Sequence, residues 1–353
     1  ASSAASDVYK RQVMPLSDSS SMHLMRAESP GPSVGKLVPK VKTTAMILYG
    51  IYVVFTVIEI IALLIAGMPL FDSMTLTFGT VGTGGFGLLN SSIASYSTAV
   101  QIIITVFMII CSINFTVYYM FLIKRPKEAL MCEEMRYYLL IVFGSALLIA
   151  FNIRASFASF GKAFQQAIFQ VASVISTTGF ATADFNLWPE FSRMILVLLM
   201  FVGACAGSTG GGFKVSRLII MVKSVRNEIM SVTHPRSVQK VHMDGRRIPD
   251  NVVKTVLCYL AGYVVILIVS VLLISLDNFD MTTNFTAVMA TFNNVGPGLN
   301  RVGPTGNFGG FSVLSKLVLM FDMLVGRLEL YPMLVIFAPG LWRIHPHRHV
   351  GKV

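Results

Sequence analysis

The stretch T-V-G-T-G-G-F at residues 80–86 decides how the rest of this chain is read. Two weaker copies follow it, T-T-G-F at 177–180 and N-V-G-P-G at 294–298. We align them with Gly82, Gly179 and Gly296 in one column. The residues upstream keep the same spacing, in the series Phe71, Phe78, Gly82; Ile168, Ile175, Gly179; and Phe285, Phe292, Gly296. The chain therefore contains three copies of one unit.

Each copy is a short apolar run of helix length that stops at a polar segment with glycine. The carboxyl end of a helix carries partial negative charge, so it favours a cation at that segment. Glycine tolerates the positive φ that turns carbonyls toward an axis, where they replace the hydration shell of an ion. We predict pore helices at 70–79, 161–175 and 281–292 and filters at 80–86, 176–180 and 293–298. The cation-coordinating carbonyls are assigned to Thr80, Val81, Gly82, Thr177, Thr178, Gly179, Asn294, Val295 and Gly296.

The composition places the chain in a membrane. Of its 353 residues, 54% are hydrophobic and 13% are charged, and the mean hydropathy is +0.70, which is too apolar for an ordinary soluble domain. Nearly uncharged runs long enough to cross a bilayer lie at 45–67, 98–123, 136–153, 251–276 and 311–341, and a sixth, at 192–231, is interrupted. We predict an all-α polytopic membrane protein.

The net charge of +11 comes from basic residues in particular connections between the spans, and it does not indicate a nucleic-acid-binding protein. Basic residues cluster at 36–42, at 124–136, at 214–254 and in the tail, and they are sparse in the connections that carry the filters. Because cytoplasmic connections are enriched in Lys and Arg, the filters are expected to face outside.

Four motifs in order resemble the Trk/Ktr/HKT superfamily of potassium transporters, and its bacterial Trk branch above all. They are T-V-G-T-G-G at 80–85, G-A-C-A-G-S-T-G-G-G-F-K at 203–214, N-V-G-P-G at 294–298 and G-R-L-E at 326–329. The resemblance implies helix–pore-loop–helix repeats around a pseudo-fourfold pore. Family members carry four repeats and this chain shows three, which we number second to fourth. We divide it into 1–12, a non-native scar; 13–44, the end of the first repeat and a linker; 45–130; 131–245; and 246–353.

The resemblance also implies the function. The chain is expected to be the pore-forming subunit of a potassium uptake and symport system, not an enzyme, in a bacterial inner membrane. It is expected to form a homodimer docked on a cytosolic, nucleotide-binding, TrkA-like regulatory subunit, with K⁺ as the transported ion and no cofactor of its own. The small residues of the interrupted span match the family's gate, which is an intramembrane loop with a facing arginine: Gly207, Ser208, Thr209, Gly210, Gly211, Gly212 and Arg327.

Several alternatives remain at this stage. A Ktr-like or HKT-like protein would use or conduct sodium, and a membrane enzyme or receptor would hold a ligand in the glycine-rich loops. The G-x-G-x-x-G pattern at 82–87 lacks the strand and helix that a dinucleotide site needs, and 207–214 misses the Walker pattern by one residue. Glu59 is either a packed carboxyl or an ion-handling group. Arg327 either faces the pore or pairs with Asp322, Glu329 or Glu59.

Geometry adds one expectation. A filter that surrounds a dehydrated cation needs four walls, and three would leave one side of the ion without oxygen ligands in an apolar setting. We therefore expect residues 13–353 alone to insert but not to conduct selectively, and we expect the parent protein to carry an upstream repeat.

Overall fold

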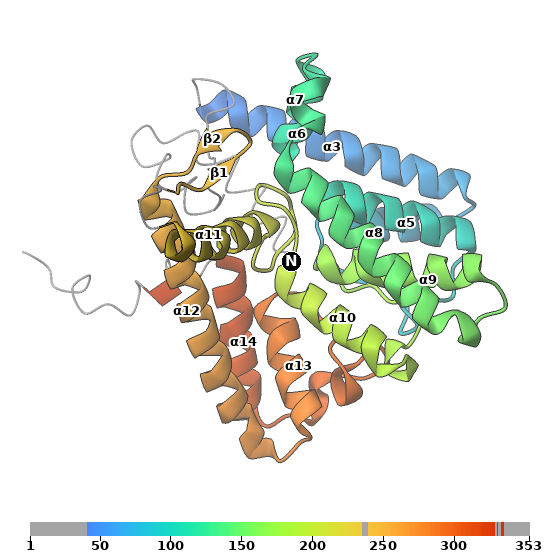
Figure 1. Ribbon diagram of the computed structural model, residues 1–353. Coiled ribbons are helices and arrows are strands. Elements are labelled where there is room, and N and C mark those ends of the chain that lie inside the picture. The colour runs from blue at the N-terminus through green and yellow to red at the C-terminus, as the bar shows by residue number, and fades with distance from the viewer. Residues whose placement is uncertain (1–40, 235–238, 329, 331–332, 335–353) are drawn as a thin grey trace, which may run out of the picture.

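The computed structural model describes residues 41–234, 239–328, 330 and 333–334 (Figure 1). The stretch 1–12 and most of the linker 13–44 lie outside the described residues, as do Glu329 and residues 335–353. Figure 1 shows two groups of helices, with α3, α5, α8 and α9 on the right and α12, α13 and α14 at the lower left.

Each of the three repeats contains an outer helix, a short pore helix and an inner helix. The second repeat consists of α3 (Val41–Ile65), α4 (Leu70–Val81), α5 (Thr98–Cys111), α6 (Phe115–Leu122) and the connecting α7 (Pro126–Leu130). The third consists of α8 (Glu133–Ile153), α9 (Phe160–Ile175), α10 (Glu190–Val202) and α11 (Val215–Thr233). The fourth consists of α12 (Asp250–Ile274), α13 (Met281–Phe292) and α14 (Val313–Leu328).

Short elements connect these helices. Single 3₁₀ turns occupy Arg154–Ser156, Phe185–Leu187, Ser275–Asp277, Asn300–Val302 and Phe308–Gly310. Between α11 and α12, β1 (His242–Met243) pairs with β2 (Arg246–Arg247) in an antiparallel hairpin. Asp244 and Gly245 form its two-residue turn with φ of 50° and 71°, as Asp-Gly hairpin turns require. This hairpin is the one departure from the predicted all-α fold among the described residues.

The repeats pack in chain order. α9 of the third repeat packs against α5 of the second, and α10 packs against α13 of the fourth. Within each repeat, the pore helix packs against its own outer helix, and α13 packs against α14 as well. The largest cluster of buried side chains is centred on α8, α9 and α10. The third repeat is therefore the middle of the described structure.

Two of the predicted spans are broken. The run 98–123, predicted as one helix, is bent by 87° between α5 and α6, which is a correction to the sequence analysis. The run 192–231 breaks between α10 and α11, as predicted. In the predicted span 311–341, the structure describes a helix over Val313–Leu328.

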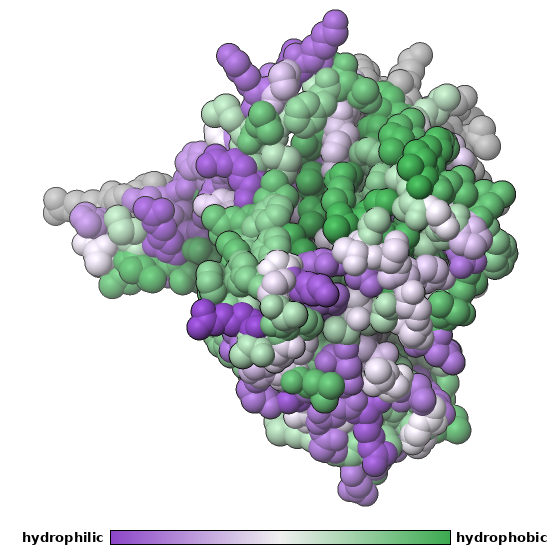
Figure 2. Space-filling model, turned by 90° about the vertical axis from the view of Figure 1, so that its right-hand side faces the viewer, coloured by the Kyte–Doolittle hydropathy of each residue, from purple (hydrophilic) through white to green (hydrophobic). Residues whose placement is uncertain are grey.

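The helices have the length and surface that a bilayer requires. Among the described residues, three helices are long and apolar enough to cross a membrane, or four if the bent pair α5–α6 forms one span. Large apolar side chains are exposed along α3 and α12, including Val54, Ile61, Val265 and Leu272. Figure 2 shows broad hydrophobic areas on one face of the molecule, interrupted by hydrophilic residues. Such surface is stable against lipid and unfavourable in water.

Candidate pore and intramembrane loop

The three pore helices end in the same backbone turn. One residue after each helix cap, Thr83, Thr177 and Asn294 adopt left-handed φ angles of 50°, 58° and 57°. Their amides donate to the carbonyls of Thr80, Val174 and Thr291, at 3.0–3.1 Å. Non-glycine residues seldom adopt this conformation, so its recurrence at three equivalent positions identifies a shared structural element.

A glycine of positive φ follows two residues later in every repeat. Gly85, Gly179 and Gly296 have φ of 64°, 84° and 102°. Their amides donate back into the pore helix, to the carbonyls of Gly79, Ser173 and Ala290. The equivalent triplets are therefore 83–85, 177–179 and 294–296.

This register corrects the alignment of the second repeat by three residues. Gly82 is the C-cap of α4 with φ of −79°, and Thr80 and Val81 lie in the last helical turn. The column shared with Gly179 and Gly296 contains Gly85. The spacing of Met74, Val81 and Gly85 matches that of the other repeats and was the signal that the sequence analysis missed.

Neighbouring triplets touch through their backbones. A Cβ at position 85 would lie 1.7 Å from the Thr178 carbonyl oxygen, and a Cβ at 179 would lie 2.2 Å from the Val295 carbonyl oxygen. The residue before the glycine in one repeat thus presents its carbonyl to the glycine of the preceding repeat. Only glycine permits this approach.

The side chains of the three left-handed residues form hydrogen bonds with the interrupted segment of the third repeat and with α14. The Thr83 hydroxyl donates to the Thr209 carbonyl at 2.9 Å, and the Thr177 hydroxyl accepts the Gly211 amide at 2.7 Å. The Asn294 side chain donates to the Met323 carbonyl of α14 at 3.3 Å. The interrupted segment of the third repeat therefore contacts two triplets directly.

That segment, the 203–214 loop, lies against the break between α5 and α6. The Cys205 amide donates to the Ser112 carbonyl, and the Thr209 hydroxyl donates to the Cys111 carbonyl. In return, the Phe115 amide donates to the Gly207 carbonyl at 3.2 Å. A broken helix leaves backbone amides and carbonyls without partners inside a membrane. Here the backbone groups freed at the α5–α6 break form hydrogen bonds with the 203–214 loop.

Two basic side chains donate to carbonyls of the 203–214 loop. Arg327 Nη1 of α14 donates to the Thr209 carbonyl at 3.1 Å, and Lys214 Nζ donates to the Gly210 carbonyl. Thr209 thus accepts from both Thr83 and Arg327. Arg327 contacts the loop through this hydrogen bond. The contact of Lys214 was not predicted, because Lys214 is the first residue of a basic run that the sequence assigns to the cytoplasm.

Two acidic residues, Glu59 of α3 and Asp322 of α14, are buried. Both Glu59 oxygens lack a hydrogen-bond partner among the described residues, and the side chain is fully buried. Asp322, which the sequence analysis offered as a partner of Arg327, instead accepts the Ser270 hydroxyl at 2.8 Å. Glu329 lies outside the described residues.

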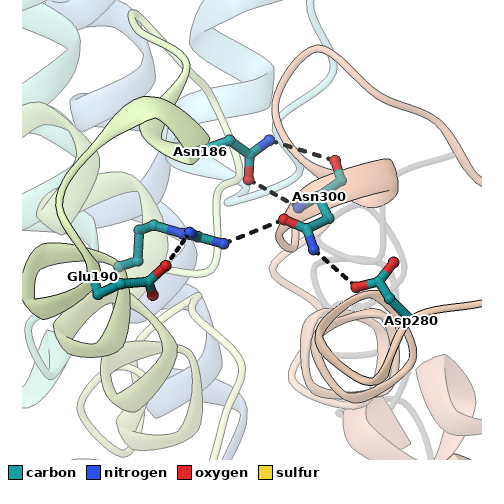
Figure 3. A network of polar contacts seen from close by, with 5 residues as sticks. Asn186, Glu190, Asp280 and Asn300 are labelled. Atoms are coloured by element: carbon teal, nitrogen blue, oxygen red, sulfur yellow. Dashed lines mark hydrogen bonds and ion pairs between the residues drawn. The ribbon is translucent and has the colours of Figure 1, made fainter.

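A polar network joins the third and fourth repeats (Figure 3). Asn300 is its centre: its amide group accepts from Arg193 and donates to Asp280, at 3.2 and 2.8 Å. Asn186 and Asn300 exchange two further hydrogen bonds, and Glu190 pairs with Arg193 at 2.6 Å. The network braces the start of α10 against the start of α13.

The site combines carbonyl-lined triplets at the ends of pore helices with a basic, glycine-rich loop. Within the described residues, no three His, Cys, Asp or Glu side chains form a metal-binding group. Backbone carbonyls are the ligands that alkali-ion filters use. The fold and the site define a pore-loop cation transport protein with several membrane spans.

The chain belongs to the TrkH family, described as cation transport proteins, whose profile matches residues 8–344. It is 35% identical to the Trk system potassium uptake protein TrkH of Salmonella typhimurium over 339 residues, or 94% of this chain and 69% of that protein. It is 30% identical to Escherichia coli TrkG over 335 residues, again 94% and 69%. The crystal structure of the potassium transporter TrkH from Vibrio parahaemolyticus has a TM-score of 0.81 and 33% identity, covering 91% of this chain and 70% of that one. The family is one of cation transporters and not of enzymes.

Proposed function

We propose that this chain is the pore-forming subunit of a potassium uptake system. Relatives that cover 94% of this chain carry that activity in their names. At the site, the observation that carries the proposal is a close backbone contact between repeats. Gly85 lies against the Thr178 carbonyl, and Gly179 lies against the Val295 carbonyl. These contacts support a ring in which carbonyls of successive repeats surround one axis, at the partly negative ends of three pore helices.

The ion would lose its water to the carbonyls of nine residues, which revise the set assigned from the sequence. They are Thr83, Gly84, Gly85, Thr177, Thr178, Gly179, Asn294, Val295 and Gly296. The membrane potential would drive entry, since one elementary charge gains about 2.3 kcal/mol per 100 mV. K⁺ is the cargo of this site and not a resident cofactor.

The 203–214 loop is proposed as the gate. Arg327 and Lys214 bring positive charge to its carbonyls, and positive charge in a pore raises the barrier for a cation. The Thr83 hydroxyl donates to the loop and the Thr177 hydroxyl accepts from it, and these two hydrogen bonds hold the loop against the filter. Opening would require these contacts to break.

The relatives' names and the basic surface support a proposal for the assembly. Proteins of a "Trk system" work with other components, and we propose a homodimer docked on a cytosolic, nucleotide-binding regulatory subunit in a bacterial inner membrane. The hairpin between α11 and α12 and its flanks carry Lys240, Arg246, Arg247 and Lys254. This basic surface is the proposed docking region.

Rubidium-86 uptake into vesicles that contain the full-length protein tests the proposal. An inside-negative potential should drive uptake, and external K⁺ should compete with it at least about tenfold better than Na⁺, which corresponds to about 1.4 kcal/mol in relative affinity. Vesicles without protein are the control. Equal competition by Na⁺ would favour the sodium-conducting alternative, and no uptake above the control would refute a pore.

A further inference from the structure

Glu134, in the first turn of α8, holds both ends of the 203–214 loop region. Its Oε1 accepts the Ala206 amide at 2.7 Å and the Ser216 amide at 3.1 Å. The side chain is only 3% exposed. Ala206 lies near the start of the loop and Ser216 is the second residue of α11, so a single carboxylate oxygen joins two backbone segments.

This carboxylate also substitutes for a missing helix cap. The residue before α11, Lys214, makes no side-chain cap, so amides at the start of α11 need an acceptor from elsewhere. A carboxylate at a helix N-terminus is favoured by the helix dipole as well as by the hydrogen bond. Removing it would leave two buried amides unpaired, which is costly away from water.

The adjacent residue, Glu133, connects the same turn to the hairpin. Cys132 provides no side-chain cap for α8, and the Glu133 amide instead donates to Asp244 Oδ1 at 2.7 Å. Asp244 is the first residue of the hairpin turn. Lys223 of α11 forms an ion pair with the Glu133 carboxylate and donates to the His242 carbonyl at 2.8 Å.

We propose that the first turn of α8 couples the hairpin to the loop, with Glu134 as the residue that positions the loop and Glu133 as the connection to the hairpin. The proposal rests on the proposed function in taking the loop as the gate. Displacement of the hairpin would shift the α8 turn through Asp244, and the turn carries the acceptor that holds Ala206 and Ser216. A partner that docks on the basic hairpin would then act on the gate through about one helical turn.

Cys205 offers a readout of the loop that does not depend on transport. Its side chain is fully buried, next to Ala206. In the full-length protein with its other cysteines replaced by alanine, maleimide labelling of Cys205 reports release of the loop, and rubidium-86 leak reports opening of the pore.

Glu134→Ala should raise both the labelling rate and the leak about tenfold. Glu134→Gln should raise them less, because its amide oxygen can still accept both hydrogen bonds. Glu128→Ala is the matched control, since Glu128 is an exposed glutamate of α7 paired with Arg125, and it should change neither. Unchanged Cys205 labelling in Glu134→Ala overturns the proposal.

Coupling to the hairpin is tested with Asp244→Gly, which removes the acceptor and keeps the positive φ. This variant should raise the labelling rate and the leak, as Glu134→Ala does. The fold-increase in the double variant should be smaller than the product of the two single fold-increases, because both substitutions act through one turn. Independent, multiplicative effects refute the coupling. If Glu134→Ala does not yield folded protein, Glu134→Gln with Asp244→Gly makes the same comparison. Faster labelling without leak supports the positioning role and refutes the gate assignment instead.

Discussion

The Cα of Gly85 lies so close to the Thr178 carbonyl that a Cβ would stand 1.7 Å from the oxygen. This contact joins the second repeat to the third at the level of the proposed filter. It also decides which glycine of the T-V-G-T-G-G run belongs to that filter.

Gly85→Ala should therefore impair ion selection, whereas Gly82→Ala should not. The alanine at 85 meets the Thr178 carbonyl and an unfavourable φ of 64°, while Gly82 has the φ of −79° that alanine adopts readily. We expect at least about a tenfold loss of K⁺ over Na⁺ discrimination in the first variant, about 1.4 kcal/mol. Rubidium-86 uptake with competing Na⁺ measures it. The opposite result would restore the alignment based on Gly82.

Gly326→Ala should destabilise the junction of α13 and α14. A Cβ there would lie 1.7 Å from the Phe292 carbonyl oxygen, so α14 would have to move away from the pore helix. Overpacking of this kind costs about 1–3 kcal/mol. Gly144→Ala in α8 is the control, because a Cβ at 144 meets nothing within 4 Å and alanine is the better helix former. Thermal unfolding in detergent should show a lower midpoint for the first and an equal or higher one for the second.

Arg327→Ala should increase the resting leak of the full-length protein. It removes a positive charge and the donor to the Thr209 carbonyl, while Thr83 still donates to the same oxygen. Arg327→Lys keeps the charge and should leak less than the alanine variant. The exposed Arg125 provides the control variant Arg125→Ala. A resting rubidium-86 leak equal to that of the parent in Arg327→Ala would contradict the gating role.

Acid should loosen the start of α13. Hydrogen bonds, first of all from the Thr283 hydroxyl, hold the pKa of Asp280 below its ordinary value of 3.8. A depressed pKa means that the carboxylate contributes stability above about pH 4, and that this contribution is lost as pH falls through the folded-state pKa. The midpoint of thermal unfolding should therefore fall more steeply below pH 4 in the parent than in Asp280→Asn. If the midpoints of the parent and of Asp280→Asn fall in parallel below pH 4, the Asp280 carboxylate does not stabilise the fold in this way.

Much of the fold could be predicted from local sequence. Apolar runs of bilayer length predicted the outer helices, and the dense small residues of 203–214 predicted the break of the third inner helix, because glycine-rich backbone does not remain helical. The break between α5 and α6 was missed, since Ser112 and Asn114 are weak polar signals within a long apolar run. Its cause is tertiary: the carbonyls it frees accept hydrogen bonds from the loop.

The sequence by itself determined the class of the molecule, the order of its repeats and the presence of a glycine at the end of each pore helix, because hydrophobicity and helix length are local properties. The choice among Gly82, Gly84 and Gly85 required the backbone angles, since all three are compatible with the same run of letters. The contacts of Glu134 with Ala206 and Ser216, which are 72 and 82 residues away, depended on packing between distant segments. Only the tertiary structure decided them, because no local pattern specifies which buried amide an acidic side chain will meet.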